Sequence, residues 1–331
     1  MVASAGISVT TNLADLRPEW ERLWRRDPAA TPFQSPAWLL AWWRFFGSGE
    51  PIVLTAHGGG GLVGLLPLYR LRERGCRKLL PIGVGLSDHV DALVDPAAPE
   101  AAVLLLGAIA DISDWDECWL PDLPGGGVLA RAIGALRLHD RTVPAAPCPT
   151  LALPRDLAAW RRAIPRKTRR YLARADARAA AFGLVIETVG GDRIDTAMAE
   201  LFALHSASWR ARGLGGVLGE PRVRGFHRAA ARALAADGVL RLYRLSLGGT
   251  ALAVYYGFAA ASGACGYLHG FDPAHADLAP GMQLIRHAIE MALAEGSASF
   301  DFLRGAERYK YSWGAVDAAK LSLRLTRGCT R

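Results

Sequence analysis

The sequence predicts an α/β protein of two mixed-sheet halves around a cleft, and three observations support this fold class. The chain has 331 residues, which exceeds what one hydrophobic core usually supports. A pattern of apolar strand, glycine turn and apolar strand occurs twice, in residues 51–71 and 239–258. Helical sequence that contains tryptophan precedes each copy. We therefore expect an N-terminal domain over residues 1–150 and a C-terminal domain over residues 151–331.

The composition is that of a folded globular protein. Hydrophobic residues make up 51% of the chain and charged residues 21%. This provides ample apolar surface for burial and excludes a disordered or collagen-like chain. The net charge of +8 favours a phosphate-bearing or otherwise anionic partner, although we expect no DNA partner.

Cysteine usage and the N-terminus indicate the cellular compartment. The five cysteines are far apart and form no CxxC pair, so they predict reduced thiols and no metal cluster. The first residues lack the basic and apolar regions of a secretory signal. One uncharged run, Leu245–Phe271, is long enough to span a bilayer, but its glycines divide it into strand-length pieces. We therefore predict a cytoplasmic protein without a membrane span.

Two β-hairpins are the clearest predicted elements. Residues 51–71 read PIVLTAHGGGGLVGLLPLYRL, which is two apolar runs joined by a glycine turn,. Residues 239–258 repeat this design around Gly248 and Gly249, and residues 264–271 add a further strand. The repetition predicts two similar α/β halves.

A proline-rich segment separates the halves. Residues 144–156 contain four prolines, which make a continuous helix or a central strand improbable,. We place the domain junction there. The next residues, PRKTRRYLARADARAAAF, predict a helix that starts near Pro165,. Its apolar stripe at helical spacing consists of Leu172, Ala175, Ala179 and Phe182,.

A second face of this helix carries a row of arginines, Arg166, Arg170, Arg174 and Arg178. Like charges four residues apart repel one another by about 0.2–0.5 kcal/mol. The row is therefore either a solvated face or a surface that binds phosphates or carboxylates. The second interpretation makes Arg170 a candidate substrate-binding residue.

Residues 267–314 carry the most chemical information. Their pattern predicts a strand, a polar loop, a helix that begins near Pro280, a parallel strand at residues 299–303 and a short helix,. A helix that follows a strand and a glycine-containing loop presents backbone N–H groups to an anion. We therefore expect a phosphate-binding site at four consecutive residues, Pro280, Gly281, Met282 and Gln283.

This order of elements resembles the coenzyme A-binding core of the GNAT acyltransferases, with the glycine-rich loop of that family reduced to Ala276–Gly281. Seven motifs in order also resemble the bacterial CelD/BcsL-type acetyltransferases. They are FQSPAW (33–38), GLLPLY (64–69), SDHVD (87–91), LHSASWRARG (204–213), HGFDP (269–273), APG (279–281) and FDFLRGAERYKYSWG (300–314). The C-terminal pattern is similar to the FemX/FemAB aminoacyl-tRNA-dependent transferases, which carry two GNAT-like domains. The resemblance implies a tandem GNAT-like fold that transfers an acyl or aminoacyl group to an amine or hydroxyl.

The resemblance also implies where the donor binds. In GNAT-type transfer the thioester donor lies between two strands that splay apart, here residues 265–270 and 299–303. The donor would be acetyl-CoA or another acyl-CoA, and no metal is needed. A backbone N–H near His269 or Gly270 would stabilise the developing oxyanion.

Candidates for proton transfer lie in the C-terminal motif. Asp301 is a candidate general base, with a structural ion pair to Lys310 or Arg304 as the alternative. Glu307 and Lys310 lie three residues apart, so they either act at the site, with Lys310 binding the cofactor, or pair with each other. Tyr309 and Tyr311 lie where many GNAT enzymes keep a tyrosine that protonates the leaving thiolate. Tyr311 is the candidate catalytic tyrosine, and a role as a core or surface aromatic is the alternative.

Two further groups are candidates on the acceptor side. One shares a helix face by its spacing and consists of His205, as a second candidate base, Trp209 and Arg212,. The other lies in the first half and consists of Asp88, His89 and Asp91. A structural histidine is the alternative for the first group. Turn capping or internal pairing is the alternative for the second, for which metal binding is disfavoured.

Three functions are compatible with these residues. The first is an acyl-CoA-dependent transferase that acts on a small molecule or saccharide, with the acceptor in the cleft between the halves. The second is a FemX-like transferase that uses aminoacyl-tRNA, in which the arginine row contacts tRNA. The third is a non-catalytic GNAT-fold scaffold in polysaccharide or envelope assembly.

Overall fold

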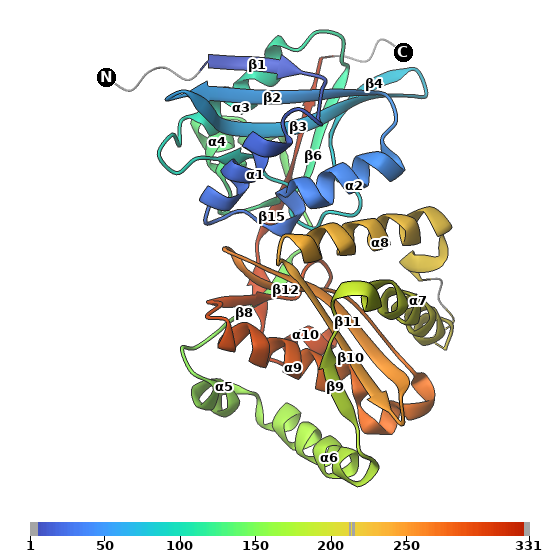
Figure 1. Cartoon of the computed structure of the whole chain (residues 1–331). Helices are drawn as coiled ribbons and strands as arrows, with labels where there is room; N and C mark the ends of the chain where they lie inside the picture. The colour runs from blue at the N-terminus through green and yellow to red at the C-terminus, as the bar shows by residue number, and fades with distance from the viewer. Residues whose placement is uncertain (1–5, 212, 214–215, 328–331) are drawn as a thin grey trace. The chain divides into compact units, whose positions relative to one another are not determined.

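The computed structural model describes residues 6–211, 213 and 216–327. The chain divides into two compact units, Met1–Pro147 with Ala318–Arg331, and Cys148–Asp317 (Figure 1). The chain therefore returns to the first unit at its end. A C-terminal domain that is continuous over residues 151–331 is wrong in this respect, because the last strand pairs with two strands of the first unit.

The first unit is an eight-stranded mixed sheet with helices. Its elements are β1 (Gly6–Thr10), α1 (Arg17–Arg26), η1 (Pro32–Gln34), α2 (Pro36–Phe46), β2 (Glu50–Gly58), β3 (Gly61–Glu73), β4 (Cys76–Pro81), β5 (Leu93–Val94), α3 (Ala101–Ala108), η2 (Ile109–Asp111), β6 (Glu117–Pro124), α4 (Val128–Ala135), η3 (His139–Arg141), β7 (Thr142–Pro144) and β15 (Lys320–Thr326). The strand order is β1-β2-β3-β4-β6-β15-β7, and β5 pairs with β3. Buried residues of the sheet, α3 and α4 form one core cluster.

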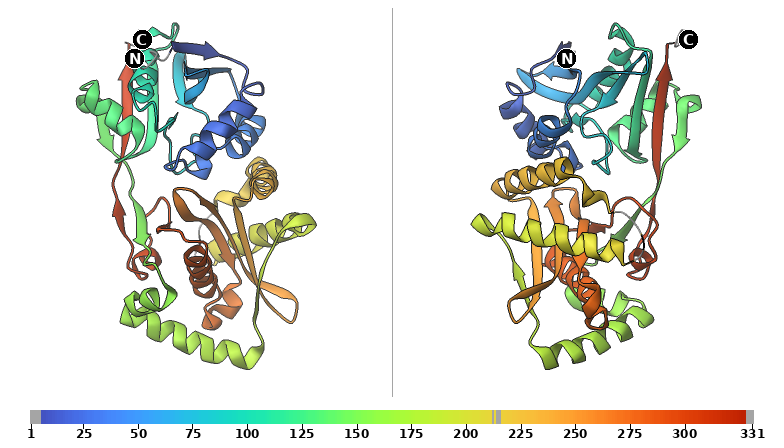
Figure 2. Two further views of the ribbon diagram at one scale, coloured as in Figure 1. Left: turned by 60° about the vertical axis from the view of Figure 1, so that its left-hand side comes forward. Right: turned by 90° about the vertical axis from the view of Figure 1, so that its right-hand side faces the viewer.

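The second unit contains a seven-stranded mixed sheet. Its elements are β8 (Cys148–Ala152), α5 (Leu157–Ala163), α6 (Arg166–Phe182), β9 (Val185–Thr188), η4 (Gly191–Arg193), α7 (Ile194–Arg210), η5 (Val217–Gly219), α8 (Pro221–Ala236), β10 (Leu240–Leu247), β11 (Thr250–Ala260), β12 (Gly263–Phe271), η6 (Pro273–Leu278), α9 (Pro280–Ala294), β13 (Ser299–Asp301), α10 (Arg308–Tyr311) and β14 (Val316–Ala318). The strand order is β14-β8-β13-β12-β11-β10-β9. Figure 2 shows α7 and α8 on one face of this sheet and α9 on the other.

Most elements predicted from the sequence are present. The first hairpin is β2–β3 and the second is β10–β11, each with a glycine turn. The uncharged run over residues 245–271 forms strands. Among the described residues, the structure has no helix whose length and apolarity would let it cross a membrane.

Two local predictions are wrong. Residues 148–152 form a strand inside the second sheet, between β13 and β14, although Pro149 was expected to prevent it. Pro149 has no N–H, but its carbonyl accepts the Phe302 N–H at 2.9 Å, so the strand needs no donor there. Phe182 at the end of α6 is 57% exposed, and of the predicted apolar stripe only Leu172 and Ala175 are buried.

Candidate active site in the second unit

The strands β12 and β13 part after a short pairing. They are parallel and pair at two positions, Ala264 with Phe300 and Cys265 with Asp301. The register between β11 and β12 shifts at Tyr256, so Tyr267 is the extra residue of a β-bulge. A bulge bends its strand, and β12 continues to Phe271 while β13 ends. We refer to the stretch of β12 beyond this pairing as the β12–β13 opening, and it is the place where the family resemblance implies a splayed pair.

The helix α9 begins beside this opening with two backbone donors. Its first intrahelical hydrogen bond runs from the Gln283 N–H to the Ala279 carbonyl at 3.0 Å. The N–H groups of Gly281 and Met282 precede that bond and are available to an anion. The side chain of Gln283 turns back and donates to the Leu278 carbonyl at 2.6 Å. Of the four predicted anion-binding residues, Gly281 and Met282 therefore present a backbone N–H, because Pro280 has none and the Gln283 N–H is used within the helix.

Three residues meet at the β12–β13 opening. A Cβ built on Gly281 would lie 3.8 Å from His269 Cδ2, so strand and helix approach closely here. The His269 ring meets the Tyr309 ring edge-on, with 5.4 Å between centroids. The Tyr311 hydroxyl instead donates to Asp317 at 2.7 Å, and this bond raises the pKa of Tyr311. Tyr309, rather than the candidate Tyr311, is the tyrosine beside His269.

Gly270 faces the opposite side of the sheet from His269. A Cβ there would lie 2.4 Å from the backbone nitrogen of His205, so only glycine allows α7 to lie this close to β12. The Ser208 hydroxyl donates to the Phe271 carbonyl at 2.5 Å and accepts the Phe271 N–H. Gly270 therefore has a packing role, and Ser208 is a residue that the sequence reasoning missed. Ser208 lies three residues after His205 on the same helix, and this spacing could have placed it on the face that packs against β12.

The predicted base His205 lies behind β12, on the face covered by α7. It is 3% exposed, and its ring lies 5.6 Å from that of the candidate Trp209. The third member of that group, Arg212, lies outside the described residues. Nearby His227 on α8 is 1% exposed. Burial, with a smaller contribution from His205, lowers the pKa of His227 to about 3, so this histidine is neutral at physiological pH.

The turn after β13 is held by buried polar contacts. Leu303 has a left-handed φ of 59°, which costs a non-glycine residue about 1–2 kcal/mol. The Asp301 carboxylate accepts the Leu303 N–H at 2.7 Å. Lys310, 3% exposed, donates to the carbonyls of Leu303 and Arg304 at 2.9 Å and of Gly305 at 3.1 Å.

Lys310 also pairs with Glu307 at 2.9 Å. The structure thus shows the pairing alternative for these two residues. The three ammonium protons of Lys310 are shared among these three carbonyls and the Glu307 carboxylate,, so in this structure Lys310 holds the strained turn.

The arginine row of α6 is only partly exposed to ligands. Arg178 donates to the Asp277 carbonyl at 2.9 Å, and Asp176 pairs with Arg286 of α9 at 2.7 Å. The remaining basic residues surround a surface groove of about 500 Å³ together with one tyrosine. The groove is lined by Arg166, Lys167, Arg170, Tyr171 and Arg174. The candidate Arg170 therefore lies on an exposed basic face.

The first-unit candidates have internal partners. Asp91 caps a helix rather than a turn. Its carboxylate accepts the N–H groups of Val128 and Leu129 at 2.9 Å, at the start of α4. Burial raises the pKa of Asp91 to about 7, although these bonds lower it. Lys320 of β15 donates to the Asp88 carbonyl and lies 3.2 Å from His89 Nδ1. These contacts support the capping and pairing alternative.

Comparisons with known proteins agree with this geometry. Residues 166–311 match the family described as acetyltransferase (GNAT) domain, and no curated protein matches the chain. The structure is similar to FemX, with a TM-score of 0.71 at 11% identity over 95% of this chain and 96% of that one. It is also similar to the C-terminal domain of a putative lysylphosphatidylglycerol synthetase from Agrobacterium fabrum, with a TM-score of 0.58 at 14% identity over 94% and 92%.

A third similar structure is L-PGS from Bacillus licheniformis, with a TM-score of 0.54 at 13% identity over 81% and 82% of the two chains. Identities this low show the fold alone. Residues 166–311 of the second unit thus resemble a GNAT domain, and the chain as a whole has the tandem mixed α/β fold that the sequence predicts. Membership of the CelD/BcsL type stays a prediction.

Proposed function

We propose that this protein is an acyl-CoA-dependent acyltransferase whose donor binds in the β12–β13 opening. The observation that carries the proposal is the start of α9 beside the opening, with the N–H groups of Gly281 and Met282 ahead of the first intrahelical bond. A helix N-terminus of this kind suits a pyrophosphate. The parted edge of β12, which continues to Phe271 after the pairing with β13 ends, suits the pantetheine amides.

The residues at the opening fit the chemistry of acyl transfer. A bound acyl-CoA would supply the activated carbonyl. Asp301, the last residue of β13 that pairs with β12, is the proposed general base that takes the proton from the acceptor. The Tyr309 hydroxyl is the proposed donor of a proton to the leaving thiolate, since Tyr309 lies against His269. We propose an amine or hydroxyl of a small molecule or saccharide as the acceptor, because the motifs resemble CelD/BcsL-type enzymes.

A charge placed at the start of α9 tests the donor site. Gly281→Asp puts a carboxylate in the first turn, where a negative charge favours the helix but repels a pyrophosphate. Gly281→Asn has the same shape without the charge and is the matched control. We expect calorimetry to show acetyl-CoA bound at least tenfold more weakly by the Asp variant than by the Asn variant, with equal or higher thermal stability. Equal affinities, or no binding of any acyl-CoA to the unmodified protein, would contradict the proposal.

Transfer from aminoacyl-tRNA is the second candidate. It is favoured by the similarity to FemX over 95% of the chain and by the exposed basic face of α6. In that case tRNA binding should weaken steeply with salt, because each neutralised phosphate releases counterions. Arg170→Gln with Arg174→Gln should reduce both the affinity and the salt slope. A tRNA gel shift that is absent, or insensitive to salt, would rule out this donor.

A further inference from the structure

A second basic groove lies on the α7–α8 face of the second sheet, opposite the face that carries α9. It has a volume of about 600 Å³. Small α7 side chains, including Ala199, Ala203 and Ser206, leave room along one wall. Three arginines from α7 and α8 line the rest together with Gly216 and Gly219. We refer to Arg210, Arg224 and Arg228 as the arginine triad.

The arginine triad is oriented by contacts that leave charge facing the groove. The Cζ atoms of Arg228 and Arg224 lie 5.3 and 5.9 Å from the centre of the Phe202 ring, which is 3% exposed. The Arg224 Nε donates to the Leu218 carbonyl at 2.6 Å, and the Arg210 Nε donates to the Ser206 carbonyl at 3.3 Å. These two bonds use the Nε atoms of Arg224 and Arg210, so their terminal nitrogens remain for a ligand, and Arg228 is placed by its contact with the Phe202 ring.

Within the part of the chain that the structure describes, the members of the arginine triad have no carboxylate partner, in contrast to Arg232 on the same helix α8. On the same helices and neighbouring strands, Arg232 pairs with Asp195 and Arg244 pairs with Glu200. No carboxylate of the described residues pairs with a member of the arginine triad. Three like charges beside one groove repel one another, and an anion between them would convert that repulsion into attraction.

We propose that the arginine triad binds the phosphate or diphosphate group of a phosphorylated small molecule. Planar guanidinium forks match phosphate oxygens in bidentate geometry, and three of them supply more charge than one carboxylate needs. The buried ring of Phe202 acts as a rigid support that holds two of the forks. This inference does not rest on the proposed donor site, because it concerns the opposite face of the sheet.

Titration of the full-length protein with inorganic pyrophosphate at low salt tests the inference. We expect Arg224→Gln and Arg228→Gln each to weaken one saturable site at least tenfold in calorimetry. Arg232→Gln is the matched control, because it removes the same charge from α8 but at an ion-paired position, and it should leave that site unchanged. Arg228→Lys keeps the charge without the planar fork, so its pyrophosphate affinity should lie between those of Arg228→Gln and Arg232→Gln.

Two further measurements separate the alternatives. Gly281→Asp should abolish any pyrophosphate binding at α9 and leave the arginine-triad site intact, so failure of one proposal is distinguishable from failure of the other. Succinate should bind at least tenfold more weakly than pyrophosphate. The inference is overturned if no saturable site exists, if Arg232→Gln weakens it as much as Arg224→Gln, or if succinate binds as tightly. Thermal melts of each variant verify that it is folded.

Discussion

The two units contain the same parallel strand pair in two different settings. In the first unit β4 and β6 pair at Lys78–Glu117 and Leu79–Cys118, and in the second unit β12 and β13 also pair at two positions. In each unit a helix connects the two strands. The crossover helix starts late in the first unit, since β4 ends at Pro81 and α3 begins at Ala101. In the second unit β12 ends at Phe271 and α9 begins at Pro280.

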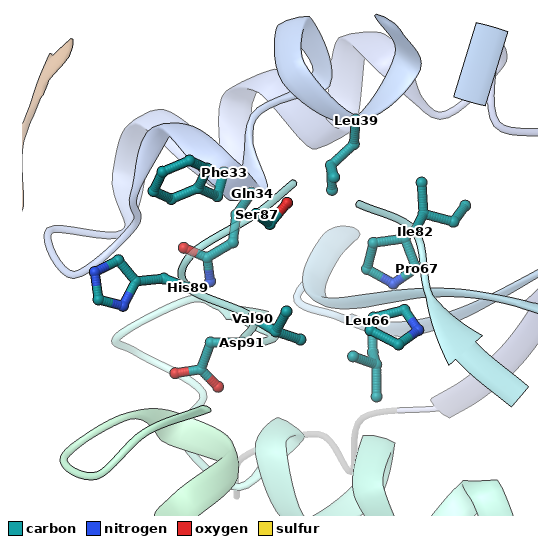
Figure 3. A pocket seen from close by; sticks show the side chains of 11 residues that line it. Phe33, Gln34, Leu39, Leu66, Pro67, Ile82, Ser87, His89, Val90 and Asp91 are labelled. Carbon is teal, nitrogen blue, oxygen red and sulfur yellow. The ribbon is translucent and has the colours of Figure 1, made fainter. Parts of the chain in front are cut away.

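The longer connection fills the first opening with the protein's own side chains. The loop after β4 brings Ser87, His89 and Asp91 against Gln34, and the cavity among them has a volume of about 10 Å³ (Figure 3), which is room for about one water molecule. Gln34 donates to the Ala92 carbonyl at 3.2 Å. We therefore place the proposed donor site in the second unit, where α9 begins soon after β12 ends.

The two predicted cofactor glycines of the second unit provide the strongest test of this comparison. Gly270→Ala places a Cβ 2.4 Å from the His205 backbone, whereas Gly281→Ala places one 3.4 Å from the Phe271 ring, an ordinary contact. We expect Gly270→Ala to lower the free energy of unfolding by about 3 kcal/mol and Gly281→Ala to leave it nearly unchanged. Chemical denaturation measures both. Equal losses in the two variants would contradict the packing role of Gly270.

The pH dependence of stability tests whether the buried His227, on the α7–α8 face of the second sheet, stays neutral in the folded protein. The folded protein holds this histidine with a pKa of about 3, whereas the unfolded chain protonates it near pH 6.5. The unfolded state therefore binds more protons, and stability falls as the pH drops from 6.5 towards 3, by up to about 1.4 kcal/mol per pH unit. His227→Gln should flatten this dependence between pH 6.5 and 5, and the exposed His139→Gln should not. The same pH dependence in all three proteins would show that His227 titrates normally.

Asp91 tests the filled opening of the first unit. Its carboxylate accepts the N–H groups of Val128 and Leu129, which would otherwise lack partners at the start of α4. Asp91→Ala should destabilise the protein by about 1.5 kcal/mol, and Asp91→Asn, which retains one acceptor, should cost less. Acyl transfer by the folded variants should keep its KM for the acceptor. A raised KM with unchanged stability would restore the acceptor-binding role and reduce the contrast between the units.

Local patterns were sufficient for several elements of the second unit. The glycine turn between alternating strands predicts β10–β11, and helical spacing after Pro280 predicts α9. Long-range contacts were not predictable in this way. The pairing of β15 with the first unit depends on strands nearly two hundred residues earlier, and Pro149 enters a sheet because only its carbonyl is needed.

The site residues also divide into those that local sequence predicts and those that depend on contacts the sequence does not show. The N–H donors of α9 follow from its start at Pro280, which the sequence indicates. The partners of Lys310 are three carbonyls of one turn, and no side-chain pattern encodes carbonyl directions. Tyr309 and Tyr311 lie on a four-residue helix, which is too short for a periodicity to show which of them faces His269.

The smallest expected effect concerns the residue before α9. Ala279 adopts a left-handed φ of 51°, at the position where the GNAT loop that the sequence resembles is rich in glycine. Ala279→Gly should relieve the strain and raise the free energy of unfolding by about 1 kcal/mol, offset in part by the greater freedom of glycine in the unfolded chain. Because the backbone donors of α9 keep their places, acetyl-CoA affinity should change less than twofold in calorimetry. A tenfold loss of affinity would mean that the strained residue itself orients the donors. The opening of the second unit would then depend on strain as well as on the place where α9 begins.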